Sequence, residues 1–464
     1  MRSRARLVAA LTAGAAIAAA LTPPAAHAHG IVQRTSLPIP EWLFGWAAAI
    51  VLVVSFAGLA LLWPSPRLQD PPWRPLPGGL GRVLGSQVVE VICAAIGGAL
   101  LAIVIYAGYE GGGSALDNLA PTFILIDFWV GLVFASVLFG DLFRAFSPWR
   151  AIQLPGIRPY PERWGRYPAA LALLGFTWIE LVSGWGEVPG DLTTAAVVYS
   201  VYTVAMQAVF GTEAWSRGGE AFAVYFNLFS RLSVWETRDR VVGLRPPLSG
   251  LPRLDPVPGT VAFVATMIGT VTFDGFSQGQ IWSDVSTELS DALDGIFGLD
   301  TAPRVVGTLG LLLGVAVVGG FYRLGIDGAR SVGGELDAAE LRRAFVHTLV
   351  PIAMVYVAAH YLTFLLFEGQ ATFYLASDPL GRGWDLFGTA DRAIDYTYLS
   401  QNATWYMQVA FVVVGHVAAL TLAHDRALAL YRDPRLAVRS QYWMLAVMVG
   451  FTSLALWLLA QAAA

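Results

Sequence analysis

The chain has 464 residues, of which 56% are apolar and 13% are charged, and its formal net charge is −4. With a mean hydropathy of +0.59, this composition excludes an ordinary soluble domain and is typical of a membrane protein. All 29 basic residues are arginine. We expect no nucleic-acid partner for this chain.

The first 28 residues have the pattern of a secretory signal peptide. Three arginines precede an apolar run over 7–21, two prolines follow it, and Ala26-His27-Ala28 forms a small-x-small cleavage site. We predict cleavage after Ala28, which would make His29 the mature amino terminus on the outer side of the membrane. The alternative is an uncleaved first helix, because the run is almost long enough to anchor.

The remainder, 29–464, is predicted to be one all-α transmembrane domain, because a bilayer core of about 30 Å needs roughly 20 apolar residues per helix. Loops between the apolar runs are too short for a separate large globular domain. About ten spans are expected, at 43–63, 86–107, 121–143, 167–185, 193–211, 259–275, 304–323, 345–367, 403–423 and 441–461.

Arginine distribution predicts the orientation of these spans. Alternate gaps hold 22 arginines, and the other mature segments hold four. Since short cytoplasmic loops are enriched in positive charge, we expect a bacterial cytoplasmic membrane protein with both mature termini outside. In the cytoplasmic gap 212–258, the amphipathic segment 220–235 is expected to lie on the membrane surface. Gly310 and Gly314 are expected to let a neighbouring helix approach closely.

Several familiar sequence signals of catalysis or cofactor binding are missing. The single cysteine, Cys93, excludes a disulfide framework within the chain. There is no paired cysteine–histidine zinc pattern, no phosphate-binding GxxxxGK motif and no GxSxG motif. Chemistry is therefore expected at ionisable side chains within the spans, where each is costly unless it is paired or functional.

Four such residues reach similar depth near the outer face. Asp127, Glu180 and His360 lie about 8 to 10 Å below the outer ends of their spans, and Asp274 lies at an outer end. We expect them to line one cavity open to the outer face. Together with His29 they are candidate ligands for a divalent metal such as zinc, manganese or iron. The terminal amine and ring of His29 also resemble a copper brace. The alternative is local pairing with arginine or backbone, with Asp274 capping its helix.

A second pair lies deeper in the bundle. Glu90 and His416 fall at comparable levels, and they are candidates for a proton relay. The stretch His424-Asp425-Arg426 is interpreted as a solvated helix end, and Asp141 is expected to pair with Arg144 near the inner interface.

Three stretches carry a resemblance to a known family. The segments 29–34 (HGIVQR), 37–44 (LPIPEWLF) and 272–277 (TFDGFS), with the span layout, resemble a family of polytopic bacterial membrane proteins labelled fenitrothion hydrolase. This resemblance covers most of the chain and implies hydrolysis of an organophosphate triester.

The sequence leaves three classes of function open. In a hydrolase, a metal held by His360 and the nearby acids would activate water towards an apolar substrate taken from the bilayer. A transporter of small solutes or metal ions would need polar groups continuing through His416 and Glu90 to the cytoplasm. A non-catalytic subunit of a membrane complex would need only exposed helix faces.

Overall fold

The computed structural model describes residues 41–333 and 337–462. In this part of the chain, eight helical runs are long and apolar enough to cross a membrane, which confirms an all-α polytopic bundle. The signal peptide and His29 lie outside the described residues. The eight runs are α2 (Glu41–Leu62), α4 (Gln87–Glu110), α5–η2–α6 (Leu119–Pro121, Thr122–Gly131, Leu132–Phe139), α9 (Pro189–Phe210), α12 (Thr260–Ser277), α14 (Ala302–Ser331), α15–η6–α16 (Ala338–Phe345, Val346–Leu349, Val350–Leu366) and α18 (Gln401–Leu430).

The other two expected spans also form helices. α8 (Tyr167–Leu181) has 15 residues, so its length of about 22 Å is less than a bilayer core. α19 (Pro434–Ala462) has 29 residues. The presence of helices at all ten expected positions agrees with the sequence pattern, and a total of ten membrane crossings stays a prediction.

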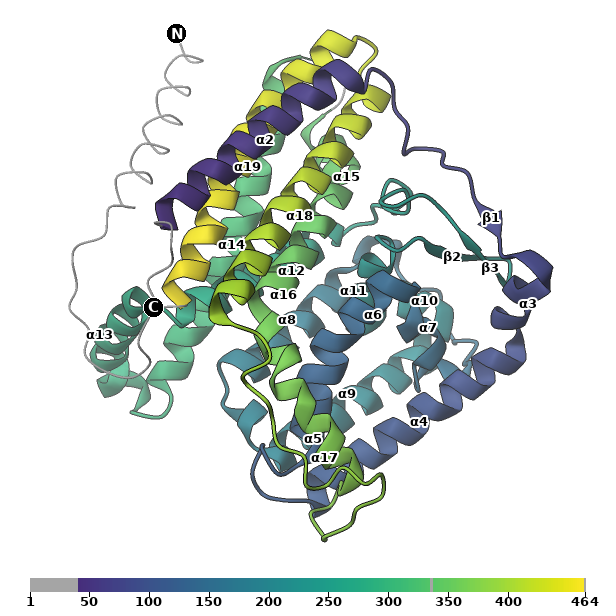
Figure 1. Ribbon diagram of the computed structural model, residues 1–464, viewed down its shortest axis with the longest axis vertical. Helices are drawn as coiled ribbons and strands as arrows, with labels where there is room; N and C mark the ends of the chain where they lie inside the picture. Colours follow the sequence, from purple (N-terminus) through teal and green to yellow (C-terminus); the bar gives the residue numbers. More distant parts are fainter. Residues whose placement is uncertain (1–40, 334–336, 463–464) are drawn as a thin grey trace.

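Two groups of helices make up the molecule (Figure 1). In the first group, α2, α12, α14, α16, α18 and α19 pack along one another. The second group holds α4, α6 and α9, together with shorter helices. α8 packs on α12, and η2 packs on α16, so these two elements join the groups.

α12 and α14 approach each other closely at small residues. A methyl group on Gly314 would lie 2.6 Å from the carbonyl oxygen of Gly269, so neither side tolerates a side chain there. Such contacts between small residues favour helix association in a bilayer. The close approach expected from Gly310 and Gly314 is thus confirmed.

The segment expected on the cytoplasmic membrane surface is instead a buried helix. α11 (Ala221–Ser230) packs against α6, α7 (Leu142–Phe146) and α8. Tyr225, Phe226 and Phe229 are almost completely buried. The prediction was wrong because the aromatic stripe of this helix packs on protein rather than lipid: Tyr225 stacks on Trp129, with ring centroids 4.5 Å apart.

A small three-stranded antiparallel sheet joins two loops. Its strands are β1 (Arg74–Pro75), β2 (Trp235–Arg238) and β3 (Val241–Leu244), in the order β1-β3-β2. The β2–β3 hairpin turns at Asp239 and Arg240, both with positive φ, as a two-residue hairpin loop requires.

The remaining elements are helices in the connections, and all of them except the 18-residue α13 are short. They are α3 (Leu80–Leu84), α7, α10 (Thr212–Gly218), α13 (Gln280–Phe297), α17 (Ala371–Ser377) and the 3-10 turns η1 (Pro77–Gly79), η3 (Arg150–Ile152), η4 (Glu162–Trp164), η5 (Trp185–Glu187) and η7 (Glu368–Gln370).

Candidate functional site

Asp274 and His360 form a buried pair between α12 and α16. Nε2 of His360 lies 2.8 Å from Oδ2 of Asp274, and the hydroxyl of Tyr361 donates to the same oxygen, also at 2.8 Å. α12 continues to Ser277, so Asp274 lies within the helix rather than capping it, and it is 7% exposed. The two neighbouring donors on α16 hold the carboxylate in one orientation.

The other ring nitrogen of His360 points towards a small cavity. A methyl group on Gly275 would lie 3.7 Å from Nδ1 of His360, and both residues line a cavity of about 30 Å³ together with Thr272 and Tyr356. About 10 to 15 Å³ of accessible cavity volume is enough to hold one water, so this cavity has room for water beside the ring.

Glu180 lies close to this pair. Its carboxylate interacts electrostatically with Asp274 and with Tyr361. The indole nitrogen of Trp129 also interacts with the Glu180 carboxylate, although neither this nitrogen nor Oε2 of Glu180 makes a hydrogen bond of standard geometry among the described residues. Buried polar atoms are costly without partners, and Glu180 and Trp129 supply polar neighbours to each other beside Asp274 and Tyr361.

Asp127 does not join the other acids. Its Oδ2 accepts a hydrogen bond from the hydroxyl of Thr372 in α17, at 2.8 Å. Trp129, two residues further along the same helix, instead contacts Glu180. Two residues along a helix correspond to roughly half a turn, so Asp127 points the opposite way. The prediction of one cavity shared by all four residues is wrong: Asp127 lines a different cavity, and of the other three only His360 lines the small one. Equal depth does not specify the direction of a side chain around its helix.

The described residues do not form the expected metal site. Within 41–333 and 337–462, no three His, Cys, Asp or Glu side chains are close enough to hold a metal ion. Asp274 and His360 supply two donors, while structural metal sites generally use four protein ligands and catalytic sites three. The described donors alone are therefore too few for the metal-dependent mechanism, and the metal site that includes His29 stays a prediction. His29, the candidate copper ligand, lies outside the described residues.

Glu90 and His416 lie in different surroundings and are not bonded to each other. Glu90 is near the start of α4, where Arg150 donates to it at 2.5 Å and Arg240 lies 3.6 Å away. His416 is completely buried in α18, and its Nδ1 bonds to the carbonyl of Val412 at 2.7 Å. Each residue has a local partner, so the geometry does not support their expected relay. Asp141 also differs from expectation, since its side chain accepts from Asn227 and caps α7.

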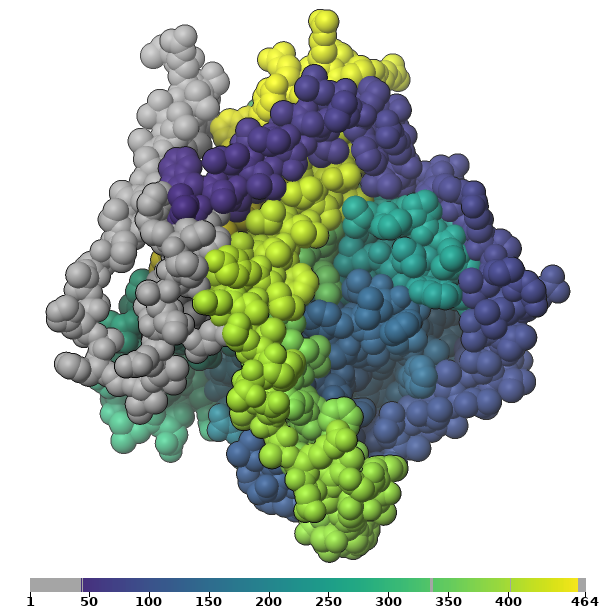
Figure 2. All heavy atoms as spheres, viewed as in Figure 1, coloured from purple at the N-terminus to yellow at the C-terminus, as the bar shows by residue number. Residues whose placement is uncertain are grey.

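A large cavity, open on part of its surface and called the chamber below, separates α4 from α8. It measures about 1370 Å³ and is lined by side chains of α4, η2, α6, α8 and α9. Figure 2 shows the surface hollowed between α4 and the segment containing α17. The walls are mainly apolar and aromatic, and Asp127 is the acid that η2 contributes. Sequence reasoning missed this chamber because no local pattern reveals how far apart two helices stand.

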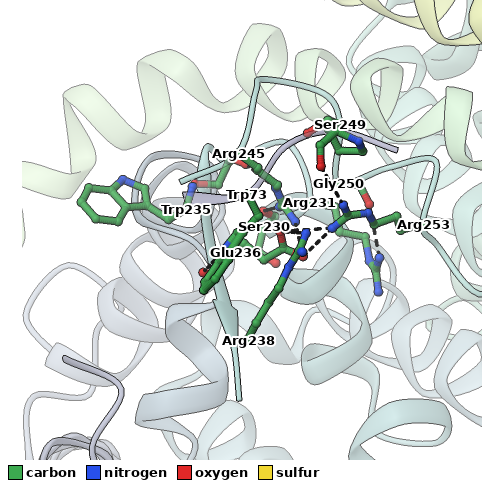
Figure 3. Close-up of polar contacts among 12 residues, drawn as sticks. Trp73, Ser230, Arg231, Trp235, Glu236, Arg238, Arg245, Ser249, Gly250 and Arg253 are labelled. Carbon is green, nitrogen blue, oxygen red and sulfur yellow. Dashed lines mark hydrogen bonds and ion pairs between the residues drawn. The ribbon is translucent and has the colours of Figure 1, made fainter. Parts of the chain in front are cut away.

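Four arginines surround Glu236 at the sheet (Figure 3). Arg238 and Arg253 donate to its carboxylate at 2.9 and 3.0 Å, and Arg245 lies 3.6 Å away. Burial alone would raise the pKa of Glu236, but the hydrogen bond from Arg238 and the surrounding positive charges outweigh it and hold the pKa below its usual value. Arg231 donates to the carbonyl of Gly250 instead. These contacts stabilise the loop fold.

Asp425 and His424 form a second buried polar cluster rather than a solvated helix end. Both are at most 1% exposed. Asp425 accepts from Trp63 and Gln69 side chains and from backbone nitrogens of the loop after α2. The expectation was wrong because α18 runs on to Leu430 and this loop covers it.

Comparison of the chain with known protein families, curated proteins and solved structures finds no match.

Proposed function

We propose that the protein binds a lipophilic small molecule inside the membrane. The chamber of about 1370 Å³ between α4, η2, α8 and α9 carries this proposal. It is larger than the roughly 300 to 1000 Å³ of a typical small-ligand pocket, and like such pockets it has mainly apolar walls. Such a ligand agrees with the apolar substrate that the family resemblance implies.

The chamber is suited to a ligand that arrives from the bilayer. Only 6% of the apolar stretch of α4 is buried inside the protein. This helix therefore forms one wall of the chamber, and its other faces are directed to lipid. Lipid tails are as apolar as the chamber walls. The hydrophobic effect therefore contributes little to the transfer of a ligand from lipid to chamber, and binding depends on shape and polar contacts.

Two glycines provide a matched test. Gly175 lines the chamber, Gly98 does not, and neither has a neighbouring atom within 4 Å of an added methyl group. We expect Gly175→Leu to weaken binding of a neutral fluorescent probe such as pyrene to the protein in nanodiscs, and Gly98→Leu to leave it unchanged. Empty nanodiscs measure probe dissolved in lipid. Equal binding by both variants and the wild type would contradict the proposal.

A second candidate function, hydrolysis, is favoured by the Asp274–His360 pair. A carboxylate bonded to one ring nitrogen orients an imidazole as a general base, and here the other nitrogen faces a cavity of water size. His360 would take a proton from water. The oxygen of that water would form a bond to phosphorus, and the bond between phosphorus and the aryloxy group would break to release an aryloxide.

Turnover of an aryl phosphotriester tests this candidate. We expect His360→Gln to reduce the rate about 10²- to 10⁴-fold, the usual contribution of general-base catalysis. Tyr396→Phe, in an exposed outer loop, is the control. An unchanged rate in His360→Gln would reject hydrolysis at this pair.

A further inference from the structure

We propose that the chamber selects a lipophilic cation, meaning an apolar molecule with one protonated amine or quaternary onium group that pairs with Asp127. This inference rests on the proposed function and adds the chemical class of the ligand. Charge complementarity and the aromatic lining carry it.

Asp127 is a carboxylate without a counter-ion. Thr372 donates to its Oδ2, and no ion pair to Asp127 forms among the described residues. The chain offers no lysine. Because an unpaired charge at membrane depth is costly, a bound cation would stabilise the ionised form of Asp127 in the chamber.

The backbone that presents Asp127 is itself unusual. Thr122–Gly131 is a π-helix, a conformation that is rare and frequently found at functional sites. The same segment places Phe123, Ile124 and Phe128 in the chamber wall beside Asp127. A polar group and its apolar surroundings are thus provided by one irregular helical segment.

Aromatic rings line the rest of the chamber. Phe176 and Trp178 come from α8, and Tyr199 and Tyr202 come from α9. The negative faces of aromatic rings attract cations, and quaternary ammonium groups are typical ligands of such cages. A neutral apolar ligand would gain little from these faces over lipid, whereas a cation gains from both the rings and the carboxylate.

The other charged residues in the chamber wall favour binding of a cation in one half of the chamber. Asp191, at the start of α9, is a second acid in the wall, and Arg163, before the start of α8, lies towards the opposite end. A cation is therefore attracted to the half containing Asp127 and Asp191 and repelled from Arg163. An anion would meet the reverse arrangement.

Three probes of one shape test the charge preference. Tetraphenylphosphonium, tetraphenylmethane and tetraphenylborate are cationic, neutral and anionic. We expect the full chain in nanodiscs, corrected for empty nanodiscs, to bind the phosphonium at least about tenfold more tightly than the methane, a preference of about 1.4 kcal/mol, and to bind the borate most weakly. Asp127→Asn, which keeps an acceptor for Thr372, should reduce the preference to the part that the aromatic rings supply, and Asp300→Asn should preserve it in full.

The outcomes separate this inference from the function on which it rests. Equal binding of the phosphonium and the methane, both lost in Gly175→Leu, would keep the chamber as a binding site and overturn cation selection. A preference that is as large in Asp127→Asn as in the wild type would overturn the role of Asp127. Failure of all three probes to bind would overturn the proposed function as well.

Discussion

Nε2 of His360 lies 2.8 Å from Oδ2 of Asp274, and this contact joins α16 to α12 across 86 residues of chain. The same carboxylate oxygen accepts from Tyr361, so one acidic side chain fixes two neighbouring donors. Two helices of the bundle are thereby held in one register at the level where hydrolysis would occur.

The first prediction concerns the energetics of this contact. Tyr361→Phe should lower the free energy of unfolding by about 1 kcal/mol, because Asp274 keeps its bond to His360. Asp274→Ala should cost about 2 to 3 kcal/mol, because it leaves two buried donors unpaired. Thermal unfolding in detergent measures both. The control is Tyr396→Phe, which removes an exposed tyrosine–carboxylate bond to Glu368; equal losses in all three variants would contradict the prediction.

The second prediction concerns orientation. In a Cys93→Ser background, Asp300→Cys should react with a membrane-impermeant maleimide on intact cells, and Arg158→Cys should react only after permeabilisation. Both positions are exposed. The expectation follows from the concentration of arginines in alternate gaps. Labelling of Arg158→Cys on intact cells would contradict the predicted orientation and indicate the opposite one.

Sequence reasoning succeeded where the signal depends only on position along the chain. Apolar runs located the long helices, and depth along them brought Asp274 and His360 to the same level. It failed where contacts depend on the direction in which a side chain points from its helix, as for Asp127, which faces the chamber rather than Asp274. It also failed for α11, because an aromatic stripe packs equally well on lipid and on protein.

The third prediction concerns acid sensitivity at the sheet. The pKa of Glu236 is lowered in the folded protein, so its ionised form stabilises the fold above the unfolded pKa of about 4.3. That contribution is lost as pH falls through the lower folded pKa. We expect Glu236→Gln to be less stable than the wild type from pH 6 to 8 by a constant amount, and the difference to shrink below about pH 4.3.

Thermal unfolding of both proteins over this pH range measures the effect. Glu288→Gln is a suitable control, because Glu288 is exposed on α13, away from the sheet. A difference between the wild type and Glu236→Gln that grows on acidification would have the wrong sign for a carboxylate with a lowered pKa.

The fourth prediction concerns Asp425, a completely buried carboxylate on α18. It accepts from Trp63 Nε1 at 3.0 Å, from Gln69 Nε2 at 2.6 Å and from the backbone nitrogens of Arg67 and Leu68. Asp425→Ala removes the common acceptor of four donors, and each donor that remains buried loses its hydrogen bond. We expect a loss of about 3 kcal/mol of unfolding free energy, since hydrogen bonds to charged groups contribute about 1.5 to 3 kcal/mol.

Trypsin provides a local readout of the same change, because Arg67 lies in the loop that Asp425 holds. Cleavage after Arg67 should become faster in Asp425→Ala than in the wild type, since the released loop opens more often. Asp300→Ala removes an exposed carboxylate far from this loop in the chain, so it should leave both stability and cleavage unchanged. If Asp425→Ala matched Asp300→Ala in both measurements, the buried cluster would contribute nothing to holding the loop against α18.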